Sequence, residues 1–290
     1  MGFFDDINSS IDLVKDTFRM FKDKPVLMEA PKQLFFLNLA VAVILFVLFL
    51  VSIPLPFLVF IPILLLIAAL LVMPFIATYY YAALSWMVFQ SFQDKPVTLA
   101  DGMDRAKANL ADIVGLTIVT MIVNWFASQL RKGQGILGII LHFVAAGIEE
   151  GWDIIGNFLL PASIVSDKNL LEAAKDAQLL LKNIPAALTG GLAFDAIRYL
   201  IMFVIMFGFF IAIFGSIFLG TLLGPLVLVL LFPIAILFFV AYALVSIAVS
   251  ATKVTFFTLL YMQLSSTVKV KKTPALDAYL ENAKKKAAKK

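Results

Sequence analysis

Six long blocks of apolar residues run through this sequence, and they constrain its fold more than any other feature. The hydrocarbon core of a bilayer is about 30 Å thick, so one crossing needs roughly 20 apolar residues in an α-helix. A helix also satisfies its own backbone hydrogen bonds, which hydrocarbon requires. The blocks cover residues 33–53, 57–92, 113–130, 136–164, 186–214 and 226–262. The sequence therefore predicts an all-α polytopic integral membrane protein with about six transmembrane helices.

The composition removes several classes of enzyme and binding protein. Hydrophobic residues make up 62% of the chain and charged residues 14%, which is typical of a membrane protein. With no cysteine and one histidine, the chain lacks side chains for thiolate metal sites, thiol nucleophiles and multi-histidine centres. No phosphate-binding glycine loop, zinc-protease helix or nucleophile elbow occurs in the sequence. We therefore expect a protein that is not an enzyme, needs no metal or cofactor and does not bind nucleic acid.

Lysine and arginine are distributed unevenly between the loops. Five precede the first block, three follow the second and three follow the fourth, whereas only Arg131 and Lys132 lie on the other side. Eight more lysines follow the last block. Because basic residues concentrate in cytoplasmic loops, this distribution predicts a multi-pass protein of the cell membrane with both termini in the cytoplasm.

The chain divides into three regions along its length. Residues 1–32 predict a cytoplasmic amphipathic helix with a linker, and residues 266–290 predict a lysine-rich cytoplasmic tail. Between them, residues 33–265 form the predicted transmembrane bundle. Within that bundle, two further cytoplasmic helices are expected at 98–112 and 169–184.

The three cytoplasmic helices are predicted from apolar residues at alternating steps of three and four, which form one stripe on a helix. In the first helix the stripe consists of Ile7, Ile11, Val14, Phe18 and Phe21. The other two helices open with a capping residue followed three positions later by an acid. These pairs are Thr98 with Asp101 and Asn169 with Glu172.

An amphipathic helix followed by a transmembrane hairpin occurs three times, which is the pattern of an internal repeat. The second and third units align at one constant offset, so that Leu99 matches Leu170 and Ala106 matches Ala177. The string DKPV argues against a simple repeat. It follows the first amphipathic helix at 23–26 but precedes the second at 94–97. The triplication therefore stays open.

The blocks 57–92 and 226–262 are too long for a single crossing of the hydrocarbon core. Either each helix breaks, at Pro74 and Pro233, or each extends into the cytoplasm. An extension of the block 57–92 would expose an aromatic stretch from residue 78 to residue 92. The cytoplasmic helices are then the elements available to cover it.

The arrangement of these elements resembles a known kind of membrane protein. An amphipathic helix with a Leu-x-(Asp/Glu) start is followed by a hairpin of spans, then by Pro161-Ala162 and a short Asp167-Lys168 loop. This order resembles uncharacterised prokaryotic polytopic membrane proteins, over about residues 10–265. It is also similar to the membrane domain fused to some glycerophosphodiester phosphodiesterases. The resemblance implies a fold only, because the catalytic domain of those enzymes is not present here.

Ionisable residues at membrane depth are costly and often functional. The fourth block holds the largest set, which consists of His142, Glu149, Glu150 and Asp153. On a helix His142, Glu149 and Asp153 share one face, whereas Gly147 and Gly151 lie on the opposite face and predict close helix packing. One interpretation is a proton or cation site, and the other is a hydrated break at the membrane surface.

A second set of ionisable residues spans the fifth and sixth blocks. Asp195 and Arg198 lie near the inner end of the fifth block and Lys253 near that of the sixth. We expect a structural ion pair among them rather than a functional site. Gly220 and Gly224 are four residues apart, which suits either helix packing or a tight outer turn.

The net charge of +4 belongs to the tail rather than to the body of the protein. From Lys269 onward the tail carries eight lysines against two acidic residues. Its terminal lysines are predicted to contact anionic lipid, and they are Lys284, Lys285, Lys286, Lys289 and Lys290. Expected partners are therefore membrane lipids and either a protein partner or further copies of this chain.

Two functions from different classes follow from these patterns. The first is a non-enzymatic scaffold or accessory subunit that contacts lipid or a protein partner through its cytoplasmic face. The alternative is a proton- or cation-coupled transporter or channel that uses the stripe of Glu149 and Asp153.

Overall fold

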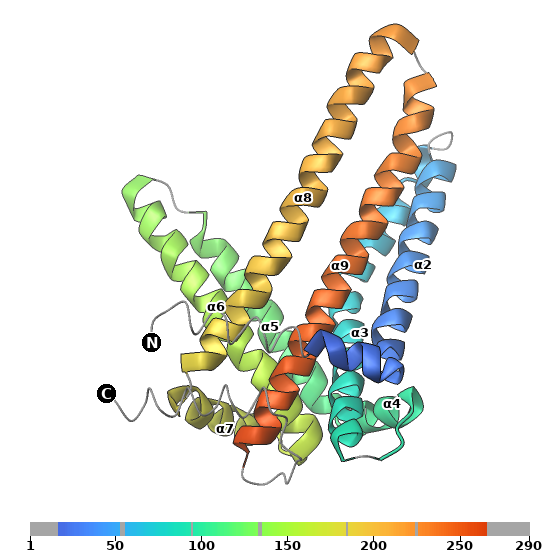
Figure 1. Cartoon of the computed structure of the whole chain (residues 1–290). Coiled ribbons are helices and arrows are strands. Elements are labelled where there is room, and N and C mark those ends of the chain that lie inside the picture. Colours follow the sequence, from blue (N-terminus) through green and yellow to red (C-terminus); the bar gives the residue numbers. More distant parts are fainter. Residues whose placement is uncertain are drawn as a thin grey trace.

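The computed structural model describes residues 17–52, 56–93, 95–132, 135–183, 185–223 and 226–265, and these residues are almost entirely helical. Six long helices form three antiparallel hairpins (Figure 1). Hairpin one consists of α2 (Glu29–Ser52) and α3 (Phe60–Phe92). Hairpin two consists of α5 (Leu110–Leu130) and α6 (Gly135–Ser166), and hairpin three of α8 (Pro185–Leu223) and α9 (Leu226–Leu264).

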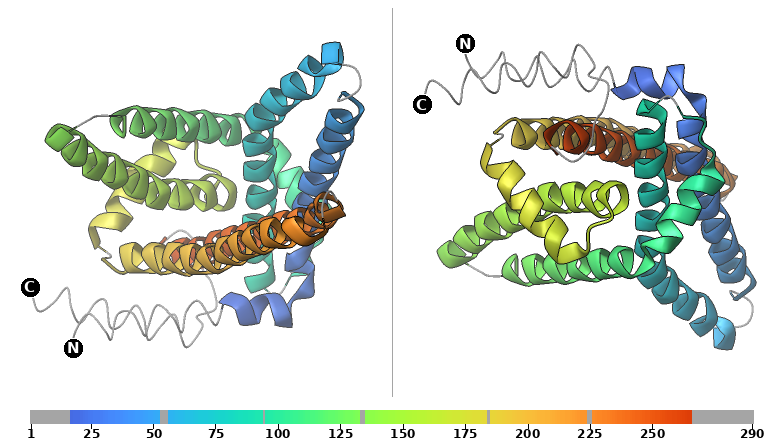
Figure 2. Two further views of the ribbon diagram at one scale, coloured as in Figure 1. Left: turned by 90° about the horizontal axis from the view of Figure 1, so that it is seen from above. Right: turned by 90° about the horizontal axis from the view of Figure 1, so that it is seen from below.

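Short helices lie at one end of these hairpins. The helices α4 (Leu99–Ala108) and α7 (Leu170–Asn183) connect hairpin one to two and hairpin two to three. Single 3₁₀ turns, η1 (Pro25–Met28) and η2 (Pro56–Leu58), flank α2. We call the end that carries α4 and α7 the polar end. The hairpins meet there and diverge towards the opposite end, so that they point in three directions when viewed along the bundle (Figure 2).

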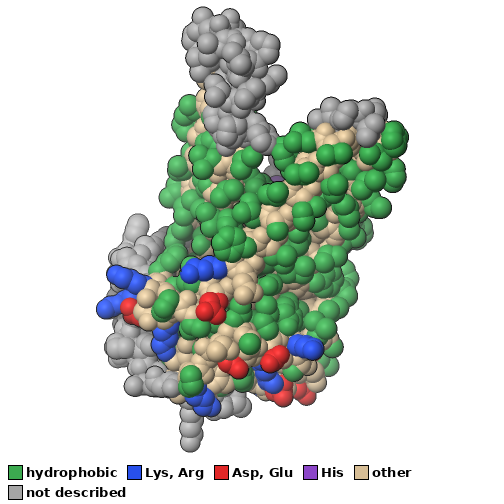
Figure 3. Space-filling view, turned by 90° about the vertical axis from the view of Figure 1, so that its right-hand side faces the viewer, with side chains coloured by type: hydrophobic (Ala, Val, Ile, Leu, Met, Phe, Trp, Pro, Cys, Tyr) green, Lys and Arg blue, Asp and Glu red, His purple; other side chains and the backbone are tan. Residues whose placement is uncertain are grey.

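Among the described residues, five stretches of helix are long and apolar enough to cross a membrane, which places the chain in the class of helical membrane proteins. These stretches are Pro25–Ser52, Phe60–Phe92, Leu110–Leu130, Phe194–Gly215 and Ile236–Met262. The helix α6, which carries the ionisable residues of the fourth block, is not one of them. On the face drawn in Figure 3, hydrophobic side chains cover the part far from the polar end, and charged side chains gather near it.

The two overlong blocks do not break at their prolines. Pro74 lies inside the continuous helix α3, and α9 runs without interruption through position 233. The 33 residues of α3 measure about 50 Å, well beyond the hydrocarbon thickness. Both helices therefore continue past the membrane core towards the polar end. Of the two alternatives, a break at the prolines or an extension, the extension is the one observed.

Burial along α3 changes where this extension begins. Leu64 and Leu70, far from the polar end, are 62% and 66% exposed, as expected of side chains that face lipid. From Ala82 onward most side chains are buried, including Leu84 and Met87. The helix thus has a lipid-facing segment and a segment packed inside the protein.

The helix α4 covers the packed segment of α3, as the sequence predicts for the aromatic stretch. Tyr79 donates a hydrogen bond from Oη to the carbonyl of Met103, at 2.9 Å. The guanidinium of Arg105 lies 4.9 Å from the ring centroid of Trp86, in a cation–π contact. Gly102 lets the two helices approach closely, because a Cβ there would lie 2.8 Å from the carbonyl oxygen of Ala83.

The two predicted helix starts are confirmed. Thr98 accepts a hydrogen bond at Oγ1 from the backbone N–H of Asp101 at 3.3 Å, and Asp101 accepts one from the backbone N–H of Thr98 at 2.8 Å. These reciprocal bonds form a capping box, which satisfies N–H groups that a helix start leaves unpaired. The N–H of Glu172 likewise donates to Asn169 Oδ1 at 3.0 Å.

Several predicted boundaries are wrong in detail. The segment expected as one helix at 98–112 is two, because α4 ends at Ala108 and a turn at Asn109 precedes α5. The tight outer turn considered for Gly220 does not include this residue, because α8 stays helical to Leu223. Glycine weakens a helix without ending it, and apolar surroundings favour internally bonded backbone. Of the predicted N-terminal region, residues 17–23 are helical, and the tail at 266–290 lies outside the described residues.

We predict that Gly102→Leu separates α4 from α3. The added side chain would meet the backbone of Ala83, which cannot move aside, so unfolding should become easier by about 1–3 kcal/mol. The measurement is the thermal unfolding temperature of the purified protein in detergent. Ala100→Leu, at an exposed position of the same helix, is the matched control and should leave that temperature unchanged. Equal unfolding temperatures for the two variants would contradict the close approach.

The capping box makes one contribution to stability depend on pH. The hydrogen bonds from Thr98 lower the pKa of Asp101 below its ordinary value of 3.8. A lowered pKa in the folded state means that this contribution is present above the unfolded pKa and is lost as the pH falls through the folded one. Asp101→Asn should therefore flatten the fall in unfolding temperature between about pH 5 and pH 2. Asp104→Asn, which alters an exposed acid outside the capping box, should keep the slope of the unaltered protein.

Candidate functional site

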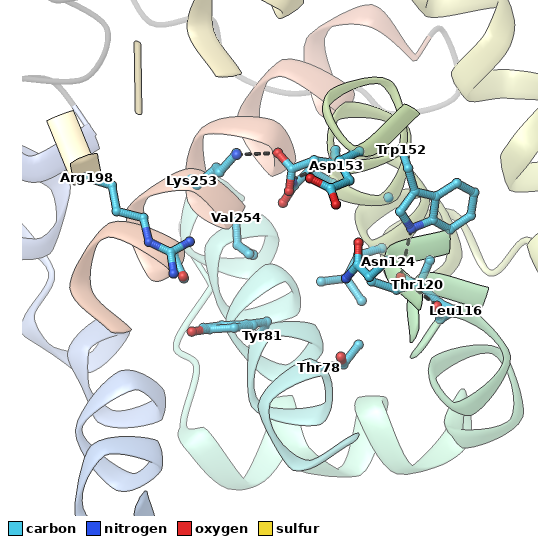
Figure 4. Close-up of a pocket in the computed structure, with 15 residues that line it drawn as sticks. Thr78, Tyr81, Leu116, Thr120, Asn124, Trp152, Asp153, Arg198, Lys253 and Val254 are labelled. Carbon is cyan, nitrogen blue, oxygen red and sulfur yellow. Dashed lines mark hydrogen bonds and ion pairs between the residues drawn. The ribbon is translucent and has the colours of Figure 1, made fainter. Parts of the chain in front are cut away.

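A polar cavity of about 280 Å³ lies where the three hairpins meet (Figure 4). All three hairpins contribute to its wall, through α3, α5, α6, α8 and α9. Its ionisable side chains are Glu149, Asp153, Arg198 and Lys253. The neutral polar side chains around them include Thr78, Tyr81, Thr120, Asn124, Asn157 and Ser250.

The cavity lies at one level of the bundle. Four of its wall residues, each on a different helix, lie eleven to thirteen residues from the polar end of that helix. These residues are Tyr81, Asp153, Arg198 and Lys253. Counted from the other end of α3, Thr78 and Tyr81 lie 18 and 21 residues after Phe60, or about 27–32 Å. A hydrocarbon core about 30 Å thick that began at Phe60 would therefore end near the level of the cavity.

A charge triad joins hairpins two and three at the edge of this cavity. The ammonium of Lys253 on α9 donates to Asp195 Oδ2 on α8 at 2.8 Å and also pairs with Asp153 on α6. The side chain of Lys253 is only 9% exposed, whereas that of Asp153 is 43% exposed. A lysine so deeply buried needs its charge balanced, and two carboxylates provide the balance.

The triad combines residues from both of the ionisable sets that the sequence suggested. The expected pair between Asp195 and Lys253 is present, and Asp153 from the other set joins it. Arg198 does not take part. Within the described part of the chain, its one hydrogen bond runs to Ser246 Oγ, at 3.4 Å, and it forms no ion pair.

The other described residues of the predicted stripe on α6, which are His142 and Glu149, do not form a chain of contacts with Asp153. Glu149 pairs with Arg131, at the end of α5, rather than with a residue of α6. His142 is exposed and does not line the cavity. The side chain of Glu150 lies outside the described residues. The structure therefore gathers Glu149 and Asp153 at the cavity and leaves His142 apart.

Neutral polar groups hold hairpin two together beside the charges. The indole of Trp152 donates from Nε1 to Thr120 Oγ1 at 3.0 Å, which ties α6 to α5. Asn157 donates from Nδ2 to the backbone carbonyl of Asp153 at 2.7 Å. The roles of Thr120 and Arg131 were not predicted from the sequence. The signal available for Thr120 was its spacing of four residues from Asn124 within an apolar block.

The predicted packing role of Gly147 and Gly151 is wrong within this chain. A Cβ added at either position would meet no atom within 4 Å. The polar face of α6 points into the bundle towards the cavity, so the glycine face points away from it. The surroundings of Gly220, and the whole of Gly224, lie outside the described residues. So do the lysines of the tail.

A second group of charges connects the elements of the polar end. Arg105 on α4 pairs with Asp167 Oδ1 at 2.8 Å and donates from Nε to the carbonyl of Ile164 at 2.9 Å. Lys168 pairs with Asp176 on α7, and this hydrogen-bonded pair raises the pKa of the Lys168 ammonium. These contacts fix α4 and α7 to the end of α6.

Among the described residues no group of three or more histidine, aspartate or glutamate side chains is arranged to hold a metal ion. Comparison of the chain with protein families, curated proteins and solved structures finds no match.

We predict that Lys253→Met destabilises the protein through the two carboxylates that it leaves behind. Breaking a buried ion pair typically costs about 3–5 kcal/mol, and the exposure of Asp153 lowers the expected loss to about 2–3 kcal/mol. The measurement is the free energy of unfolding from titration with a denaturing detergent. The matched control is Lys132→Met, at an exposed lysine on hairpin two, and it should have no effect.

A triple variant separates the charge from the shape of the site. Adding Asp153→Asn and Asp195→Asn to Lys253→Met removes the unpaired charges, so most of the lost stability should return. A triple variant that is no more stable than Lys253→Met would mean that the lysine acts through its packing rather than through its charge.

Proposed function

We propose that this protein is a non-enzymatic scaffold or accessory subunit of the cell membrane. In this proposal its cytoplasmic face contacts lipid or a protein partner, and its spans hold that face at the membrane surface. The observation that carries the proposal is the divergence of the three hairpins from the polar end, which leaves their apolar helices largely exposed. An open apolar arrangement offers large surfaces for other molecules in the bilayer.

The apolar surfaces of the hairpins support this proposal quantitatively. In the most apolar 18-residue windows of the first span and of those in α3 and α8, only 6% of the residues are buried inside the chain. Several bulky side chains along them are more than half exposed, for example Leu64, Phe203 and Phe207. Lipid or other protein chains would cover such helices in the membrane.

The proposal includes six spans, with α6 as the crossing beyond the five apolar stretches. Its 32 residues are long enough to cross, and its ionisable residues are partly compensated by Arg131 and Lys253. Six crossings return the chain to the side on which it began. With the basic loops inside, both termini and the polar end would lie in the cytoplasm.

The polar end is the face proposed to meet a partner or the membrane surface. Its helix α7 exposes Leu171 at 70% together with Glu172 and Lys175. These exposed side chains are available to a partner at this face. The terminal lysines of the tail would add attraction to anionic lipid, at about 1 kcal/mol for each lysine. The resemblance to the membrane domain of phosphodiesterase fusions stays a proposal about fold.

One observation favours the alternative, a proton- or cation-coupled transporter or channel. Although Asp153 pairs with Lys253, 43% of its side chain is exposed, and both it and Glu149 line the cavity. An exposed carboxylate in a cavity can exchange a proton or an ion. Against transport, His142 does not reach this cavity, so the proposed relay from Glu149 and Asp153 is not formed.

Two measurements on the purified protein distinguish these functions. For a scaffold, we expect no proton or cation flux above that of empty liposomes, and we expect a stoichiometric protein partner or retained lipid after purification in mild detergent. Flux that disappears in the double variant Glu149→Gln with Asp153→Asn would overturn the scaffold. The double variant Asp101→Asn with Asp104→Asn, which removes two charges from exposed positions of α4, is the control and should not alter flux.

A further inference from the structure

We propose that the polar cavity binds the headgroup of a membrane phospholipid that carries both a phosphate and a primary ammonium group. The proposal goes beyond the scaffold function and does not depend on it. It rests on three observations about the cavity, which concern its charges, its level in the bilayer and its size.

The cation available to a phosphate is Arg198. Its guanidinium carries five N–H donors, and among the described residues only one hydrogen bond, the long one to Ser246, uses them. Lys253, the other cation of the cavity, already pairs with two carboxylates. Figure 4 shows Arg198 on one side of the cavity with its guanidinium directed towards the interior. Guanidinium groups bind phosphate by two parallel hydrogen bonds, so a phosphate oxygen pair fits this side.

The opposite side of the cavity suits an ammonium group. Asp153 lies there together with Asn124 (Figure 4), and Glu149 also lines the cavity. The triad of Lys253 with its two carboxylates has one negative charge in excess, and its most exposed member is Asp153. A primary ammonium has three N–H donors for such acceptors, whereas a trimethylated ammonium has none. The cavity thus presents a positive and a negative side to one zwitterion.

The level of the cavity matches the level of lipid headgroups. Thr78 and Tyr81 lie about 27–32 Å along α3 from Phe60, which is the full thickness of the hydrocarbon core. Beyond this level the side chains of α3 become buried by protein. A phospholipid in the same leaflet would therefore have its phosphate beside the cavity, with its acyl chains along the exposed apolar helices.

The size of the cavity favours a headgroup over a larger molecule. Its volume of about 280 Å³ is just below the usual range for complete small-molecule sites, which starts near 300 Å³. The hairpins diverge from this level, so acyl chains can remain outside while the headgroup enters. The exposed side chain of Asp153 indicates that the cavity is open.

The full-length protein is first placed in lipid nanodiscs. Native mass spectrometry then measures how much of each lipid the released protein retains. Phosphatidylethanolamine, phosphatidylcholine and phosphatidylglycerol are supplied in equal amounts. We expect phosphatidylethanolamine to be retained at least tenfold more than either of the others. Equal retention of phosphatidylcholine would overturn the role of the ammonium, and equal retention of phosphatidylglycerol would overturn the zwitterion.

Variants test the role assigned to Arg198. Arg198→Gln should lower the retention of phosphatidylethanolamine at least tenfold, and Arg198→Lys should lower it less because the charge remains. Lys132→Gln, on the loop side of hairpin two, is the control and should not change it. Unchanged retention in Arg198→Gln would overturn the proposal. If that variant does not fold, Arg198→Lys and the lipid series decide, and full retention in Arg198→Lys would overturn the bidentate contact.

A soluble competitor distinguishes a lipid from a free zwitterion of the same chemistry. O-Phosphoethanolamine at millimolar concentration should leave the retained phosphatidylethanolamine in place, because it lacks the acyl chains that the exposed helices contact. Its displacement of the lipid at micromolar concentration would assign the cavity to a soluble ligand and overturn the lipid site.

Discussion

The difference between helix length and bilayer thickness determines most of this structure. A hydrocarbon core of about 30 Å covers roughly 20 residues of helix, but α8 and α9 have 39 residues each and α3 has 33. The excess length of α3 and α9 lies at the polar end, where lipid no longer covers it. The helix α4 therefore packs there, and burial along α3 changes from lipid-facing to protein-facing at Ala82.

The same boundary explains where the charges lie. A buried lysine is costly in hydrocarbon and much less costly where water and headgroups are near, so Lys253 lies eleven residues from the polar end of its helix. Its pairs with Asp153 and Asp195 then connect helices of two hairpins. Since replacing a buried ion pair by apolar residues is often neutral or stabilising, we expect the triad to fix which helices meet more than to add stability.

Much of the fold follows from patterns within short stretches of sequence, and the site does not. Apolar blocks and the capping pair of Thr98 and Asp101 predict helices and their starts, because both act over a few residues. Helical periodicity also places Gly151 and Asp153 on opposite faces of α6. It does not say which face points inward, since that depends on partners far along the chain. Lys253 follows Asp153 by 100 positions, so no local pattern predicts their pair.

The cavity also relates the three hairpins to one another energetically. Its wall contains Thr78 from hairpin one, Thr120 from hairpin two and Arg198 from hairpin three. A ligand that contacts all three binds the assembled arrangement more tightly than a separated one, and this difference stabilises the assembled arrangement. From the cavity towards the opposite end the hairpins diverge. Between the cavity and the polar end they pack together, as in the ring contact of Phe158 with Phe257 and the hydrogen bond from Thr258 to Ser85. Occupancy of one small polar site would therefore influence the spacing of long apolar surfaces, which are the surfaces proposed to meet lipid or a partner.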